Sequence, residues 1–170
     1  MRCSVYIATS LDGYIARPDG GLDWLSAAQQ TGEDYGYARF AATVDVVVLG
    51  RSTYDTVLGF GAWPYGGKRV VVMTHRPAAP RHGEELFDGT PAELVARLRA
   101  DGHRRVYVDG GRVIQQFLAA GLLDDLTISI IPVVLGAGIP LFDGSEQALL
   151  LDGAEPFPSG LVQLRYRLAP

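Results

Sequence analysis

The chain has 170 residues, of which 48% are apolar and 20% are charged, and its formal net charge is -4. This length fits one domain with a sizeable core, and the composition is that of a globular rather than a disordered protein. The negative charge argues against nucleic acid as a partner, because binding to a phosphate backbone requires a basic face.

The cysteine, the histidines and the apolar runs exclude further classes of protein. Cys3 is the only cysteine, and the three histidines lack the spacing of metal ligands, so we expect no disulfide framework and no metal. No apolar run approaches the roughly 20 residues of a membrane span, and the N-terminus does not have the pattern of a signal peptide. These features predict a cytoplasmic protein that does not enter a membrane.

Apolar runs alternate with helical patterns, which predicts one α/β domain over residues 1–170. The expected strands are Cys3–Ala8, Val46–Leu49, Arg69–Met73, Arg105–Val108, Asp125–Leu135 and Leu161–Leu168. The expected helices are Glu33–Thr43, Arg51–Val57, a helix that follows a capping box at Thr90 and runs to about Ala100, and Arg112–Ala120.

Three of the expected strands carry a further indication of their place in the sheet. The continuous β-branched run Val46–Leu49 indicates a strand that is buried on both faces. Pro132 cannot donate to a strand ladder, so we expect an edge position or a bulge there, and Leu161–Leu168 is expected to be a closing edge strand.

Three strands run directly into turns that can present backbone N–H groups to a ligand. These turns are Leu49-Gly50-Arg51-Ser52-Thr53, Met73-Thr74-His75-Arg76 and Val108-Asp109-Gly110-Gly111-Arg112. Ligands of open α/β sheets collect at the carboxyl ends of strands, where helix N-termini favour anions. Paired glycines let the main chain approach a pyrophosphate closely; the alternative is that they only make a tight turn.

Basic residues stand in the same turns. Arg51, Arg76 and Arg112 each follow a strand end, and His75 joins them. Arginine forms two parallel hydrogen bonds to phosphate oxygens, so such a group in an acidic protein favours an anionic ligand over three unrelated surface arginines. The segment Gly136-Ala137-Gly138 is not followed by a helical pattern, so we interpret it as a turn between strands and not as a phosphate loop.

The order and spacing of several motifs resemble the dihydrofolate-reductase-like family. The motifs are Ser10–Ala16, Asp23-Trp24, Gly50–Tyr54, and Asp109–Val113 followed by Phe117-Leu118. The segment Ile131–Phe142 is similar to the C-terminal reductase domain of the bifunctional riboflavin-biosynthesis deaminase-reductase. The zinc-deaminase pattern is absent from the sequence, so the resemblance is to the reductase domain standing alone.

The resemblance implies a mostly parallel central sheet flanked by helices, with NADPH lying across the strand ends. It implies that hydride passes to a pyrimidine- or pteridine-like heterocycle, in a riboflavin-type or dihydrofolate-type reduction. The cofactor-binding residues that it implies are Ala8, Ile15 and Ala16 at the nicotinamide, Gly50, Arg51, Ser52, Thr53, Gly110, Gly111, Arg112 and Val113 at the pyrophosphate and adenosine, and Thr74, His75 and Arg76 at the ribose and its 2′-phosphate. The alternatives are a non-catalytic NADPH-binding module and a flavin-binding reductase.

The resemblance also places the substrate against the nicotinamide, beside the first helix and the loop that carries Trp24. Asp34 falls where folate-reducing members keep a carboxylate, which would bond an N–H edge of the substrate and relay a proton as the catalytic group. The alternative is that Asp34 is a solvated residue in the first turn of a helix. The other expected substrate contacts are Trp24, Tyr35, Ala38 and Ser129.

The run Leu126–Phe142 holds many apolar residues and few charges, more than one edge strand should leave exposed. We therefore expect a homodimer that pairs through this end of the sheet, as the resembled reductases do. The alternative is that another part of the same chain covers this surface.

Overall fold

The computed structural model describes residues 1–29 and 32–169. Its strands are β1 (Arg2–Ser10), β2 (Tyr14–Ala16), β3 (Val46–Gly50), β4 (Arg69–Met73), β5 (Glu85–Phe87), β6 (Arg105–Asp109), β7 (Asp125–Ile131), β8 (Ile139–Pro140), β9 (Leu149–Pro156) and β10 (Val162–Leu168). Its helices are the short 3-10 helix η1 (Asp23–Leu25), α1 (Ser26–Gln29), α2 (Tyr37–Ala41), α3 (Arg51–Leu58), α4 (Pro91–Ala100) and α5 (Gly111–Ala119).

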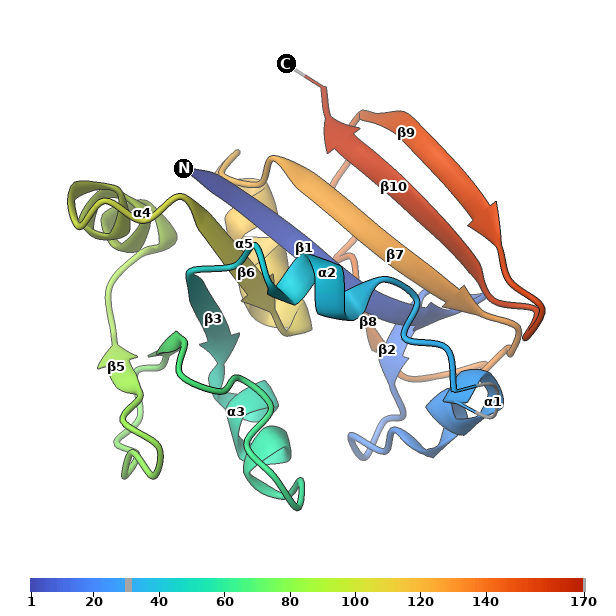
Figure 1. Ribbon diagram of the computed structural model, residues 1–170, viewed down its shortest axis with the longest axis horizontal. Coiled ribbons are helices and arrows are strands. Elements are labelled where there is room, and N and C mark those ends of the chain that lie inside the picture. Colours follow the sequence, from blue (N-terminus) through green and yellow to red (C-terminus); the bar gives the residue numbers. More distant parts are fainter. Residues whose placement is uncertain (30–31, 170) are drawn as a thin grey trace.

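A mostly parallel sheet forms the centre of the molecule, as the sequence predicts. In the described residues it has eight strands in the order β5-β4-β3-β6-β1-β7-β10-β9, and β2 and β8 form a separate two-stranded sheet. The strands from β5 to β7 run parallel, while β10 is antiparallel to both of its neighbours. Figure 1 shows α2 crossing in front of the sheet and α5 lying behind it.

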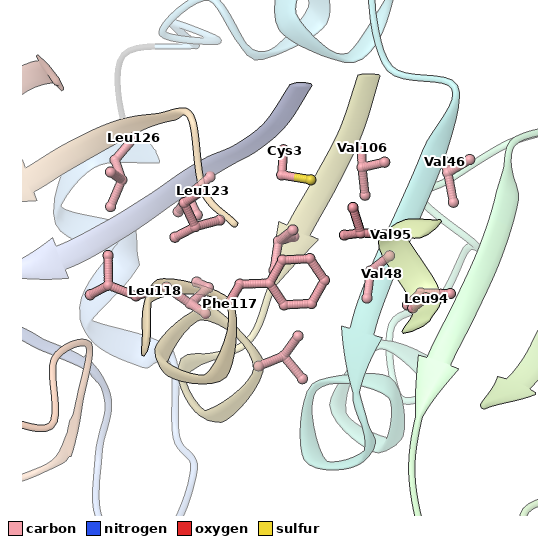
Figure 2. Packing of buried hydrophobic residues seen from close by; sticks show 14 of the residues in the cluster. Cys3, Val46, Val48, Leu94, Val95, Val106, Phe117, Leu118, Leu123 and Leu126 are labelled. Atoms are coloured by element: carbon pink, nitrogen blue, oxygen red, sulfur yellow. The ribbon is translucent and has the colours of Figure 1, made fainter. Parts of the chain in front are cut away.

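Two apolar layers hold the helices on the sheet. Figure 2 shows Phe117 of α5 and Leu94 of α4 packed on one face, against valines from β3 and β6. On the opposite face, Phe40 of α2 and Tyr54 of α3 pack in a second layer. Residues of β3 alternate between the two layers, which confirms that the Val46–Leu49 run is buried on both faces.

The helix after Thr90 begins as its sequence predicts. The Thr90 hydroxyl accepts the Glu93 backbone N–H at 3.3 Å, and the Glu93 carboxylate accepts the Thr90 backbone N–H at 2.7 Å. Both halves of the capping box are therefore formed. The segment Gly136–Gly138 is a turn between β7 and β8, as expected.

The helix expected over Glu33–Thr43 is shorter than predicted. It begins only at Tyr37 and ends at Ala41, because Tyr35 and Gly36 have φ angles of 54° and 85°, which no right-handed helix contains. The residues before it form a turn instead.

The far end of the sheet also differs from the expectation. The strand Asp125–Leu135 ends at Ile131, just before Pro132, and it lies between β1 and β10 rather than at an edge. The expected closing strand, β10, is not an edge either, because β9 pairs with it on the outside. β9 went unpredicted because its sequence contains an aspartate, a glycine and a proline, which are rare in strands.

Of the helices in residues 1–29 and 32–169, none combines the length and the hydropathy needed to cross a bilayer. The same residues contain no group of three or more histidine, cysteine or acidic side chains placed to hold a metal ion.

Candidate cofactor and substrate site

The parallel strands bring the predicted turns to one edge of the sheet. Gly50 at the end of β3 pairs with Met73 of β4, and Leu49 pairs with Asp109 of β6. The turns after β3, β4 and β6 therefore lie next to one another. This is the edge at which open α/β sheets bind ligands.

The backbone at Gly110 closely approaches the start of α3. Gly110 has a φ of 105°, and a Cβ there would collide with the Thr53 hydroxyl and lie 3.6 Å from the Gly50 nitrogen. A Cβ at Gly50 would lie 3.0 Å from a methyl group of Val113. Four predicted cofactor residues thus contact one another, and α3 and α5 begin side by side with bare glycine backbone between them.

The predicted basic residues divide into two kinds. Arg51 makes an ion pair with Asp55 at 2.9 Å and donates to the Pro77 carbonyl at 2.7 Å, so it ties α3 to the turn after β4. Arg76 and Arg112 are exposed, and no carboxylate of residues 1–29 or 32–169 lies within ion-pair distance of either. These two guanidinium groups are therefore available to an anionic ligand.

The turn after β4 is held by its own side chain. The Thr74 hydroxyl accepts the Arg76 backbone N–H at 3.1 Å, and the Thr74 backbone N–H donates to the Phe87 carbonyl at 2.8 Å. His75 and Arg76 project from this turn and are exposed.

The loop after β1 is fixed to the segment after β7 by Asp12. The Asp12 carboxylate accepts the Ser10 hydroxyl at 2.6 Å and the backbone N–H groups of Leu135 and Gly136 at 3.1 and 2.7 Å. These bonds, the one from Ser10 above all, lower the pKa of the Asp12 carboxyl. The loop continues into β2, which pairs with β8.

Two of the residues expected at the nicotinamide, Ile15 and Ala16, lie on β2. The side chain of Ile15 reaches the start of α5, because a Cβ at Gly111 would lie 2.8 Å from its terminal methyl group. Ala16 is buried, and Ala8 on β1 contacts the apolar cluster that contains Trp24.

The expected substrate contacts lie in different environments. Trp24 is 4% exposed and packs with Ala28, Ile131 and Leu161, while Ser129 on β7 is also buried. Asp34 and Ala38 are exposed.

The Asp34 carboxylate caps the start of α2. It accepts the backbone N–H groups of Gly36 and Ala38 at 2.8 and 3.1 Å. These bonds lower the pKa of its carboxyl, so Asp34 is an ionised cap and not a carboxyl buried against apolar neighbours.

Asp109, at the end of β6, carries a buried carboxyl, although the sequence indicated this residue only as part of a glycine turn. Burial raises its pKa to about 6, although hydrogen bonds from the Tyr107 side chain and the Gly110 N–H oppose the rise. Burial raises the pKa values of the Tyr37, Tyr65 and Tyr107 phenols, and the negative charge of Asp109 raises them further. The sequence contains one signal for this buried carboxyl, an acidic residue at the end of an otherwise buried strand.

Residues 4–162 match the sequence model of the RibD C-terminal domain. The chain belongs to this family. The expected resemblance to the riboflavin-type reductase domain is thus confirmed, and so is the dihydrofolate-reductase-like fold. RibD C-terminal domains are reductase domains, which makes this chain a member of an oxidoreductase family.

Similar proteins fall into two groups. The chain is 40% identical over 168 residues to the Bacillus subtilis (strain 168) protein described as uncharacterized protein YwjB, with 95% of each chain covered. It is 37% identical to a Shewanella sp. PV-4 protein described as a candidate riboflavin biosynthesis protein, whose crystal structure matches with a TM-score of 0.92 over 100% of both chains.

The second group shares the fold alone. A Thermotoga maritima diaminohydroxyphosphoribosylaminopyrimidine deaminase/5-amino-6-(5-phosphoribosylamino)uracil reductase matches with a TM-score of 0.74 at 16% identity. The match covers 99% of this RibD C-terminal domain and 56% of the Thermotoga chain.

The raised pKa of Asp109 predicts a pH-dependent stability. Between the unfolded pKa of about 4 and the folded value of about 6, the folded protein binds more protons than the unfolded chain, so stability falls as pH rises. The free energy of unfolding of the wild type, relative to that of Asp109→Asn, should fall by roughly 2 kcal/mol between about pH 4 and pH 7. Urea denaturation of both proteins across this range measures it, and parallel stability curves would contradict the assignment.

Proposed function

We propose that this protein is a cytosolic NADPH-dependent reductase that transfers hydride to a pyrimidine- or pteridine-like heterocycle. One observation carries the proposal: the adjoining starts of α3 and α5, with bare glycine backbone between them, lie beside a carboxyl of raised pKa at the end of β6. Membership of the RibD C-terminal domain family supports a reductase, and the description of the Thermotoga protein supports a pyrimidine substrate.

The residues at this edge fit a dinucleotide. Glycine backbone at Gly110 and Gly111 would approach the pyrophosphate, since a Cβ at either position would meet a neighbouring side chain. Arg112 is exposed for the same phosphates, and the remaining contacts would come from Gly50, Arg51, Ser52, Thr53 and Val113. NADPH, when bound, supplies the hydride.

The other two parts of the dinucleotide have their own candidate residues. Thr74, His75 and Arg76 stand one strand further along the edge, where an adenosine ribose and its 2′-phosphate would lie. Ala8, Ile15 and Ala16 would flank the nicotinamide from β1 and β2.

Reduction of a C=N or C=C bond adds a hydride to one atom and a proton to its neighbour. We assign the proton to Asp109, because a carboxyl with a pKa of about 6 is partly protonated near neutral pH. Asp34 fits less well, since its carboxylate has a lowered pKa and is engaged by two backbone N–H groups. Trp24, Tyr35, Ala38 and Ser129 complete the proposed substrate side.

Cofactor preference tests the role of the turn after β4. We predict that the protein binds NADPH at least about tenfold more tightly than NADH, or ~1.4 kcal/mol, because Arg76 and His75 offer charge-assisted bonds to a 2′-phosphate. Arg76→Ala should remove most of this preference, while Arg104→Ala, an exposed arginine at the opposite end of the strands, should leave it intact. Titration of both cofactors decides the point, and equal wild-type affinities would refute it.

The proton donor is tested by two matched variants. We predict that Asp109→Asn lowers kcat/KM by about 10²–10⁴-fold, the usual contribution of a general acid, while NADPH affinity stays within about twofold. Asp34→Asn, which keeps an oxygen that can cap α2, should cost less than about tenfold. NADPH oxidation would be followed with dihydrofolate, ribosylaminopyrimidines and small imines or enones as substrates.

The pH profile adds a second readout. Because the protonated form of Asp109 is the active one, wild-type kcat/KM should fall as pH rises through about 6. A large loss in Asp34→Asn together with a small one in Asp109→Asn would move the proton relay to Asp34.

We also propose that the protein is a homodimer that pairs through the β7-β10-β9 end of the sheet. Large apolar side chains are exposed there, among them Leu151 at 59%, Leu150 at 44% and Phe142 at 40%. An open apolar groove lies beside them, lined by side chains of β7, β10 and β9 that include Ile128, Leu164 and Leu149. A monomer would leave this surface in water.

Light scattering at micromolar concentration should therefore report twice the monomer mass. Leu151→Glu should shift the protein to a monomer, since burial of the new carboxylate in the interface is costly. Leu86→Glu is the matched control, because Leu86 is 38% exposed on β5 at the opposite end of the sheet. A wild-type monomer would contradict the proposal.

A further inference from the structure

Two buried polar side chains, Gln163 and Ser129, lie next to each other on the face of the sheet that α2 covers. Gln163 of β10 pairs in register with Ser129 of β7, which pairs with Ala8 of β1. Gln163 and Ser129 are 4% and 6% exposed. Buried polar groups of this kind are costly unless they are bonded, so the partners of Gln163 show what it does.

The side-chain amide of Gln163 donates only to groups of the protein. Its Nε2 lies 3.0 Å from the Tyr6 hydroxyl, 3.0 Å from the Tyr35 carbonyl and 3.2 Å from the Ser129 hydroxyl. The Tyr6 hydroxyl also donates to the Tyr35 carbonyl. An amide nitrogen has two N–H groups, so three acceptors use its full capacity and leave none for a substrate.

The Tyr35 carbonyl belongs to a strained part of the backbone. Tyr35 has a φ of 54°, in the left-handed region that residues other than glycine rarely adopt, and this conformation persists only where its surroundings hold it. Two donors hold the carbonyl, and the Tyr35 phenol donates to the Ala28 carbonyl and lies 3.0 Å from the Ser159 hydroxyl. Tyr35 is thus fixed at both its backbone and its ring.

The conformation of Tyr35 decides where α2 begins. Gly36 follows it at a φ of 85°, and α2 starts at Tyr37. The Phe40 ring of α2 packs edge-on against the Tyr107 ring, two residues before Asp109 on β6, with the ring centroids 5.3 Å apart. The Tyr35 backbone therefore sets the distance between α2 and the proposed proton donor.

We propose that Gln163 is a positioning residue of the active site: it holds the Tyr35 carbonyl, and so fixes the start of α2 against Asp109. The inference rests on the proposed function for its effect on turnover, whereas its effect on the position of α2 is independent of it.

The Tyr35 carbonyl requires a hydrogen-bond donor from residue 163, which the glutamine amide supplies. A leucine of similar size would leave the Tyr35 carbonyl with one donor fewer. A glutamate would repel that carbonyl when ionised, but when protonated it could donate one hydrogen bond to it. Both substitutions, Gln163→Leu and Gln163→Glu, keep a side chain of similar size, and only the protonated glutamate restores a donor, so together they test the donor itself.

The first measurement uses the protein without cofactor. Amide hydrogen exchange at Gly36 and Ala38, whose N–H groups Asp34 accepts, should be at least about tenfold faster in Gln163→Leu than in the wild type. Exchange in α5 should not change. Gln116→Leu, a substitution of an exposed glutamine on α5, is the matched control and should behave as the wild type at Gly36 and Ala38.

The second measurement is turnover. Gln163→Leu should lower kcat/KM about tenfold or more while NADPH affinity stays within about twofold, a division that general destabilisation does not produce. Gln163→Glu should approach wild-type kcat/KM as the pH is lowered, because its carboxyl then donates to the Tyr35 carbonyl. In a double-mutant cycle with Tyr6→Phe, the losses should be less than additive, since both side chains act on one carbonyl.

Several outcomes overturn the proposal. Wild-type exchange at Gly36 and Ala38 in Gln163→Leu would do so, as would wild-type turnover or strictly additive losses with Tyr6→Phe. If the wild type oxidises no NADPH with any substrate of the panel, the proposed function fails, and the exchange experiment still decides whether Gln163 positions α2.

Discussion

The close approach of Gly110 to the start of α3 is the contact on which the carboxyl edge of the sheet depends. This contact exists because β3 and β6 are parallel neighbours, so that α3 and α5, which follow them, begin next to each other. A side chain at Gly110 would collide with Thr53 and push α5 away from α3. The same geometry brings Asp109, one residue earlier, to the end of a strand that is buried on both faces. The bare glycine backbone between α3 and α5 and the enclosed carboxyl are therefore consequences of one strand pairing.

The burial of Asp109 raises the pKa of its carboxyl at a cost in folding stability. Burial of the carboxyl away from water disfavours its charged form, which is why its pKa rises. A protein that needed only a stable fold would place an apolar residue at this position, as it does at Val106 and Val108 on the same strand. Such departures from the pattern of the core are commonly found at functional sites.

The sequence predicted what depends on neighbouring residues and missed what depends on distant ones. Val46–Leu49 and the Thr90 capping box carry their signals locally, and both were placed correctly. The false start of the helix at Glu33 arose because the left-handed Tyr35 is held by Tyr6 and Gln163, which are 29 and 128 residues away. The raised pKa of Asp109 similarly depends on burial of its carboxyl, which packing within the folded chain produces. No pattern within a few residues records either fact.

Asp12 couples the loop after β1 to the segment after β7. Its bonds to Leu135 and Gly136, together with the pairing of β2 and β8, join two loops that are more than a hundred residues apart in the chain. Neither loop can swing away from the site alone, because its motion breaks the bonds to the other. The two segments are therefore coupled, because a displacement of one is transmitted to the other through these bonds.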